Sequence, residues 1–113
     1  MHTLYGISNC TTVKKAKDWL NGHNIEYQFH DYRKQGLTED LLKSFDEKLG
    51  WETILNKRST SWRKLTDEQR ETVSRKTALQ YMEESPTLIK RPILDIGEKL
   101  VIGFTAEHYQ QVL

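Results

Sequence analysis

The sequence contains very little cysteine: Cys10 is the only one among 113 residues. One cysteine cannot close an internal disulfide, which excludes a secreted domain held together by disulfides. Long hydrophobic runs are also absent, since no stretch approaches the ~20 apolar residues that span a bilayer. Residues 1–22 show no apolar stretch followed by a small-residue cleavage site. These absences lead us to expect a cytoplasmic protein that does not enter a membrane.

The sequence also lacks an excess of either positive or negative charge. Lys and Arg number 17 against 16 Asp and Glu, so the formal net charge is +1. A balance this close to zero gives no overall electrostatic signature for nucleic acid or an anionic membrane, and we expect neither as a direct partner. One cysteine and four scattered histidines have no metal-site spacing, so no metal is predicted. The apolar fraction of 36% still supplies a core, which excludes a disordered chain.

The first thirty residues predict a strand, a helix and a second strand. Residues 4–7 form a short apolar run, and apolar side chains then recur at helical spacing from Thr11 until Gly22. Residues 25–30 alternate between apolar and polar, as a strand does. A helical crossover of this length indicates that the two strands are parallel.

The middle of the chain predicts helices. Thr38 is placed to cap a helix that Gly50 ends, and a short helix follows over 51–55. Residues 56–64 are polar and basic without a clear period, which predicts a surface loop anchored by Trp62. A further helix is predicted from 66 until Pro86 interrupts it.

The end of the chain predicts a hairpin and a helix. Residues 93–104 contain two strand runs joined at Gly97-Glu98, and Thr105 is placed to cap a short final helix. The order of elements therefore predicts an α/β fold with a mixed sheet.

Cys10 lies where the first strand meets the first helix, and two interpretations of it are open. Free N–H groups and the dipole at a helix start stabilise a thiolate, with Lys14 adding charge and Asn9, Thr11 and Thr12 offering hydrogen-bond donors. Alternatively, Cys10 is a small buried hydrophobic residue, as a lone cysteine usually is. The four histidines are interpreted as solvated or capping residues.

If Cys10 is reactive, its second thiol has to come from outside the chain. Val13 stands where a dithiol motif has its second cysteine, so no internal disulfide cycle is available. Glutathione or a partner protein would then resolve a mixed disulfide. This conclusion follows from the cysteine count alone.

Two basic segments also allow two interpretations each. Arg91-Pro92 precedes a strand. In the structural interpretation Pro92 marks the start of the strand, with a cis peptide bond as an option. In the functional interpretation Arg91 holds the thiolate or an anionic substrate. The sequence favours the structural interpretation. The run 57–64 is interpreted as a solvated basic loop rather than as a site for an anionic ligand or nucleic acid.

Three motifs together resemble the ArsC/Spx family of arsenate reductase-like proteins, and most of all its YffB branch. They are YGISNCTTVKKA at residues 5–16, LNKR at 55–58 and LIKRPI at 88–93. The resemblance spans nearly the whole chain and implies a single thioredoxin-like domain with a helical insertion over approximately 38–85. It implies that Cys10 is the catalytic nucleophile. The implied substrate-binding, glutathione-binding or thiolate-stabilising residues are Asn9, Thr11, Thr12, Lys14, Asn56, Lys57, Arg58, Arg91 and Pro92.

The sequence departs from the pattern that arsenate reduction needs. Asn56 stands where arsenate-reducing members of the family carry arginine, and residues 99–103 contain no arginine. Two bidentate oxyanion contacts are thereby lost. The resemblance therefore favours an oxidoreductase of another kind, a glutathione-dependent thiol reductase, with glutathione as co-substrate and a glutathionylated molecule as partner.

The alternative function is regulatory. Spx-type members of the family bind the α subunit of RNA polymerase and sense oxidants through a pair of cysteines, of which this chain has only Cys10. The missing cysteine removes the disulfide switch but leaves a thiol-independent protein contact open. On this hypothesis Cys10 is incidental, or becomes glutathionylated as a one-cysteine sensor.

Overall fold

The computed structural model describes residues 2–113, which divide into two compact units. The first unit runs up to Gly36 and resumes at Arg91, and the second unit is Leu37–Lys90. The elements of the first unit are β1 (His2–Gly6), α1 (Thr11–Gly22), β2 (Tyr27–Asp31), α2 (Tyr32–Gln35), β3 (Ile93–Asp95), β4 (Leu100–Ile102) and α8 (Ala106–Val112).

The first unit is built on a mixed four-stranded sheet with the strand order β2-β1-β3-β4. β1 and β2 are parallel, with Gly6 opposite Asp31 at their carboxyl ends, while β3 pairs antiparallel to both β1 and β4. An N-terminal βαβ segment and a C-terminal ββα segment in this order make a thioredoxin-like sheet. The parallel pair, the hairpin and the mixed α/β class predicted from the sequence are confirmed.

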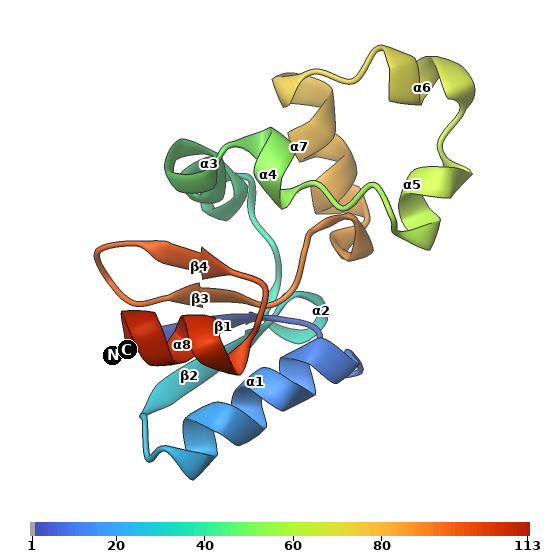
Figure 1. Ribbon diagram of the computed structural model, residues 1–113. Helices are drawn as coiled ribbons and strands as arrows, with labels where there is room; N and C mark the ends of the chain where they lie inside the picture. Colours follow the sequence, from blue (N-terminus) through green and yellow to red (C-terminus); the bar gives the residue numbers. More distant parts are fainter. Residues whose placement is uncertain (1) are drawn as a thin grey trace. The chain divides into compact units, whose positions relative to one another are not determined.

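The helices α1 and α8 cover one face of this sheet (Figure 1), and their apolar sides share a core with it. The buried residues of that core are Leu4, Val13, Ala16, Leu20, Leu94, Val101 and Tyr109. The three from α1 are those whose spacing predicted the helix. Burial of this apolar surface from five elements anchors the start of α1 against the sheet.

The second unit is helical. Its elements are α3 (Glu39–Leu49), α4 (Trp51–Ile54), α5 (Thr60–Lys64), α6 (Asp67–Glu71), α7 (Arg75–Glu84) and the 3₁₀ helix η1 (Pro86–Leu88). Thr38 caps α3 by accepting from the Leu41 N–H, as its place in the sequence predicts. The apolar sides of α3, α4, α7 and η1 supply its buried residues, among them Leu42, Phe45, Ile54, Met82 and Leu88.

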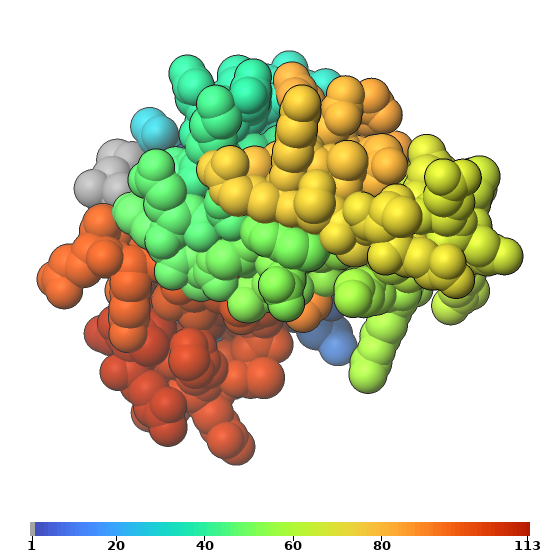
Figure 2. Space-filling model, turned by 90° about the horizontal axis from the view of Figure 1, so that it is seen from above, coloured from blue at the N-terminus to red at the C-terminus, as the bar shows by residue number. Residues whose placement is uncertain are grey.

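Two predictions for the second unit were wrong in detail. The segment 56–64 contains the helix α5, because the Ser59 hydroxyl accepts from the Trp62 N–H and starts a helical turn. The predicted helix from 66 to Pro86 is divided into α6 and α7, because Ser74 and Thr77 form a capping box that begins a new helix. No residue of α5 or α6 is buried, and side chains of these helices lie on the surface in Figure 2.

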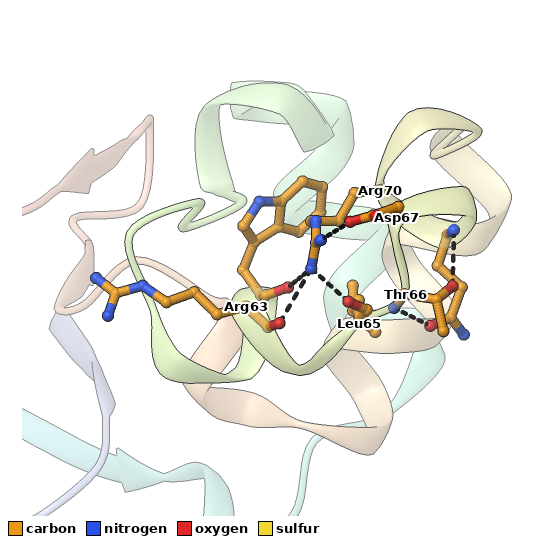
Figure 3. Close-up of polar contacts among 7 residues, drawn as sticks. Arg63, Leu65, Thr66, Asp67 and Arg70 are labelled. Atoms are coloured by element: carbon orange, nitrogen blue, oxygen red, sulfur yellow. Dashed lines mark hydrogen bonds and ion pairs between the residues drawn. The ribbon is translucent and has the colours of Figure 1, made fainter.

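One arginine organises the turn between α5 and α6 (Figure 3). The guanidinium of Arg70 donates to the carbonyl oxygens of Arg63 at 3.0 Å and Trp62 at 3.4 Å, and to that of Leu65. It also pairs with the Asp67 carboxylate. These bonds satisfy carbonyl groups that the end of a short helix leaves without an intrahelical partner.

Within residues 2–113, no helix has the length and apolar character that crossing a membrane requires.

Candidate functional site

Cys10 is the N-cap residue of α1, as its place in the sequence suggested. Its backbone is extended, with φ −101° and ψ 126°, and its carbonyl accepts the first helical bond from the Lys14 N–H at 3.0 Å. A tight turn leads to it from β1, closed by the Cys10 N–H donating to the Ile7 carbonyl at 3.3 Å. The residue is half-buried.

The surroundings of Cys10 favour its anionic form. Burial alone raises the pKa of the thiol, but the backbone N–H of Val13, the side chain of Arg91 and the backbone N–H of Thr12 lower it, and together they prevail. The pKa of Cys10 therefore lies below the ordinary thiol value. The thiol makes no side-chain capping bond of standard geometry, so these groups act chiefly on the charged sulfur.

Arg91 reaches this site from the opposite end of the chain. It directly precedes β3, and its peptide bond to Pro92 is cis, the option that the sequence left open. Pro92 is buried, and its carbonyl accepts from the Gly103 N–H at 2.8 Å. The guanidinium contributes both a hydrogen bond and a positive charge at the Cys10 sulfur. Pro92 thus precedes β3 with a cis peptide bond and Arg91 lies at Cys10, while the binding of an anionic substrate by Arg91 stays a prediction.

The other predicted residues near Cys10 divide into two groups. Thr12 acts through its backbone N–H, while Asn9 and Thr11 are exposed on either side of the cysteine. Lys14 corrects an expectation: its Nζ lies 3.3 Å from Asp18 Oδ2 in an exposed ion pair, and its charge is not among the causes of the Cys10 shift. Its partner at i+4 draws the side chain along the helix surface.

Asn56, Lys57 and Arg58 belong to the second unit, where they line a pocket of about 530 Å³ together with Glu52, Leu55 and Lys90. The Asn56 side chain accepts from the Arg58 N–H at 3.1 Å, and the Lys57 Nζ lies 5.6 Å from the centre of the Trp62 ring. Three cationic side chains against one carboxylate give this pocket a positive balance. Its role in binding a substrate stays a prediction.

The sequence analysis missed Ser8, Asp31 and Tyr32. Asp31 is buried at the end of β2, where its carboxylate faces Ser8 in the turn before Cys10. The Tyr32 hydroxyl is buried without a hydrogen-bond partner, and the charge of Arg91 acts on it. The signal available in the sequence was an aspartate directly after an alternating strand, a typical helix N-cap position.

Within residues 2–113, no three His, Cys, Asp or Glu side chains lie close enough together to hold a metal ion. The chemistry that the site offers is that of one thiolate beside one guanidinium.

The fold and the site define a thioredoxin-like α/β protein with a single cysteine at the start of its first helix. The model of the ArsC family matches residues 5–112, and the chain belongs to that family. A protein of Haemophilus influenzae with no assigned role is 48% identical over 110 residues, 97% of this chain and 96% of that protein.

Two further relatives carry names. The solved structure of a protein named YffB has a TM-score of 0.94 and 37% identity, and the match covers 100% of this chain and 99% of that one. The global transcriptional regulator Spx of Streptococcus mutans is 33% identical over 116 residues, 100% of this chain and 83% of Spx. The resemblance to the ArsC/Spx family that the sequence motifs carried is confirmed.

Proposed function

We propose that this protein is a glutathione-dependent thiol reductase whose nucleophile is Cys10. The observation that carries the proposal is the contact of Arg91 with the sulfur at the start of α1, which lowers the pKa of the thiol. A larger thiolate fraction near neutral pH makes the cysteine a better nucleophile. Membership of the ArsC family, in which a cysteine follows the first strand, supports the assignment of the nucleophile.

The reaction consists of two thiol–disulfide exchanges. The Cys10 thiolate attacks the glutathione sulfur of a mixed disulfide, forms a bond to it, and releases the other thiol as a thiolate that takes a proton from water. The thiolate of a second glutathione then attacks the same sulfur. Glutathione disulfide leaves, and Cys10 is again a thiolate. The glutathionylated substrate is reduced, and glutathione is oxidised.

The single cysteine determines this sequence of steps. Val13 occupies the position where a dithiol motif would supply a resolving thiol, so the mixed disulfide on Cys10 needs a second glutathione. Arsenate reduction is not proposed, because Asn56 replaces an arginine and residues 99–103 contain none.

The test is the rate at which the protein reduces a glutathionylated peptide in the presence of glutathione. Glutathione reductase reduces the glutathione disulfide that forms, and the accompanying oxidation of NADPH is measured. We expect Cys10→Ser to abolish turnover while the circular dichroism spectrum stays that of the wild type. The matched control is Ser44→Ala, which removes a hydroxyl from α3 that bonds only to the Leu41 carbonyl and leaves the thiol and its turn in place. Turnover by Cys10→Ser at the wild-type rate would contradict the proposal.

A second candidate function is regulatory and is favoured by the 33% identity to Spx along the whole chain. On this proposal the protein binds the C-terminal domain of the RNA polymerase α subunit without using its thiol. Titration of that domain to tens of micromolar, with the wild type and with Cys10→Ser, tests it. Equal binding by both proteins supports the regulatory function, and absence of binding by both rules it out.

A further inference from the structure

Asp31 is the charged residue that the proposed chemistry does not use. It ends β2 and is 3% exposed, and among residues 2–113 it is the one charged side chain that is buried. Removing a carboxylate from water is unfavourable unless hydrogen bonds replace the lost hydration. The groups that donate hydrogen bonds to this buried carboxylate are therefore held in place by it.

The carboxylate of Asp31 joins two segments of the first unit. Its Oδ1 accepts from the Arg33 N–H at 2.8 Å, and the Lys34 N–H also donates to the carboxylate. On its other side it accepts from both the hydroxyl and the backbone N–H of Ser8. Four donors thus surround the carboxylate, two from the first turn of α2 and two from the turn between β1 and α1.

The position of Ser8 gives this contact its importance. β1 ends at Gly6, which lies opposite Asp31 in the parallel pair, and only three residues separate Gly6 from Cys10. Ser8 is the middle one. A carboxylate that holds Ser8 at two atoms restricts the path of this short turn, and so restricts where the Cys10 sulfur lies relative to the N–H groups of α1.

We propose that Asp31 is a positioning residue for Cys10, which acts by holding the turn at Ser8 and does not itself touch the substrate. The inference rests on the proposed thiol chemistry of Cys10. A positioning role and a purely electrostatic role of Asp31 predict opposite changes in the pKa of Cys10 when the carboxylate is removed. Loss of a negative charge near a thiol, taken alone, favours the thiolate and lowers its pKa. Loss of positioning moves the sulfur away from its stabilising donors and raises the pKa.

The experiment is the rate of Cys10 alkylation by iodoacetamide as a function of pH, measured by intact mass on the full chain. In Asp31→Asn the shape is kept, but an amide NH₂ faces the N–H donors that the carboxylate bound. We expect the midpoint of the profile to move upward toward the ordinary thiol value, and the rate at pH 7 to fall by about threefold to tenfold. Ser8→Ala should shift the midpoint in the same direction by less.

The matched control is Asp95→Asn in the same unit. Asp95 Oδ1 also accepts a backbone bond, from the Gly97 N–H at 2.8 Å, but it serves the hairpin between β3 and β4. We expect this variant to keep the wild-type midpoint. Thermal unfolding of each variant shows whether it is folded. If Asp31→Asn does not fold, the midpoint of Ser8→Ala alone tests the positioning role. Ser8 is exposed, so alanine at this position should leave the protein folded.

The outcomes separate this inference from the proposed function. Folded Asp31→Asn and Ser8→Ala with the wild-type midpoint, or with a lower one, overturn the positioning role. A wild-type midpoint at the ordinary thiol value overturns the proposed thiolate chemistry itself. A lowered wild-type midpoint that both variants raise supports both.

Discussion

Gly6 and Val13 approach each other so closely that a Cβ on residue 6 would lie 2.7 Å from Cγ2 of Val13. Gly6 ends β1 and Val13 is in the first turn of α1, so this contact brings the helix start against the strand that precedes Cys10. A side chain larger than hydrogen at position 6 would push the two elements apart. The glycine is therefore part of what positions the thiol.

Gly6→Ala should destabilise the protein by roughly 1–3 kcal/mol, the usual effect of forcing an extra methyl group into a packed site. Urea unfolding measures the change in the free energy of unfolding. Gly22→Ala is the control, since a Cβ at Gly22 meets nothing within 4 Å and alanine suits the end of a helix. Equal stability of Gly6→Ala and the wild type would show that α1 shifts without penalty.

Arg91→Ala should raise the midpoint of the Cys10 alkylation profile, because the substitution removes both a hydrogen bond and a positive charge from the sulfur. Arg91→Lys keeps the charge and should give an intermediate midpoint. Lys14→Ala is the matched control, since it also removes one cation, but one that is paired with Asp18. If Lys14→Ala shifted the midpoint as much as Arg91→Ala, a specific role for Arg91 would be excluded.

Asp31 should make the stability of the protein depend on pH in the acid range. Burial raises the pKa of Asp31, but the hydrogen bonds from Arg33, Ser8 and Lys34 outweigh it, so the folded pKa lies below the ordinary value. The ionised carboxylate therefore contributes stability above about pH 4, and the contribution is lost as the pH falls through the folded pKa.

Urea unfolding of the wild type and Asp31→Asn between pH 7 and pH 3 measures this contribution. We expect the variant to be less stable by roughly 1–3 kcal/mol at pH 7, with the difference shrinking below about pH 4. Asp18→Asn, at an exposed carboxylate, should change stability by less than about 0.5 kcal/mol. A difference that stays constant with pH would show that the charge of Asp31 is irrelevant.

Arg70→Ala should loosen the turn between α5 and α6, because three carbonyl groups lose their donor. A hydrogen bond from a charged group contributes about 2 kcal/mol to the free energy of unfolding. Hydrogen–deuterium exchange measures the effect, as faster exchange confined to α5 and α6. The control is Arg63→Ala, whose side chain is exposed. Ser59 caps α5, and Thr66 caps α6 by accepting from the Gln69 N–H. Unchanged exchange in Arg70→Ala would mean that these two caps suffice to hold both helices.

The parts of the fold that the sequence predicted depend on local pattern. Val13, Ala16 and Leu20 repeat at helical spacing and are all buried in α1. Thr38 and Thr105 cap the helices that they were predicted to cap. In these segments a cap or an apolar stripe lies within a few residues of the backbone it organises, so no knowledge of the rest of the chain is needed.

The parts that could not be predicted depend on residues distant in the sequence or on weak local signals. Arg70 supports α5 from across a turn, and nothing in its immediate neighbours indicates that role. Asp31 meets Ser8 only because β1 and β2 are parallel in one particular register. Arg91 was a candidate from the sequence, but its contact with Cys10 needs β3 beside β1, which no local pattern specifies.

The pairing of Leu4 with Leu94 has a consequence for how the protein is made. β1 is synthesised first, and its partner β3 follows only after the helical second unit, Leu37–Lys90, has been translated. Long-range strand pairing of this kind is slow, because closing the intervening chain into a loop costs entropy before the strand contacts can stabilise the structure. Arg91 directly precedes β3, so its share in lowering the pKa of Cys10 is added only once β3 has paired with β1.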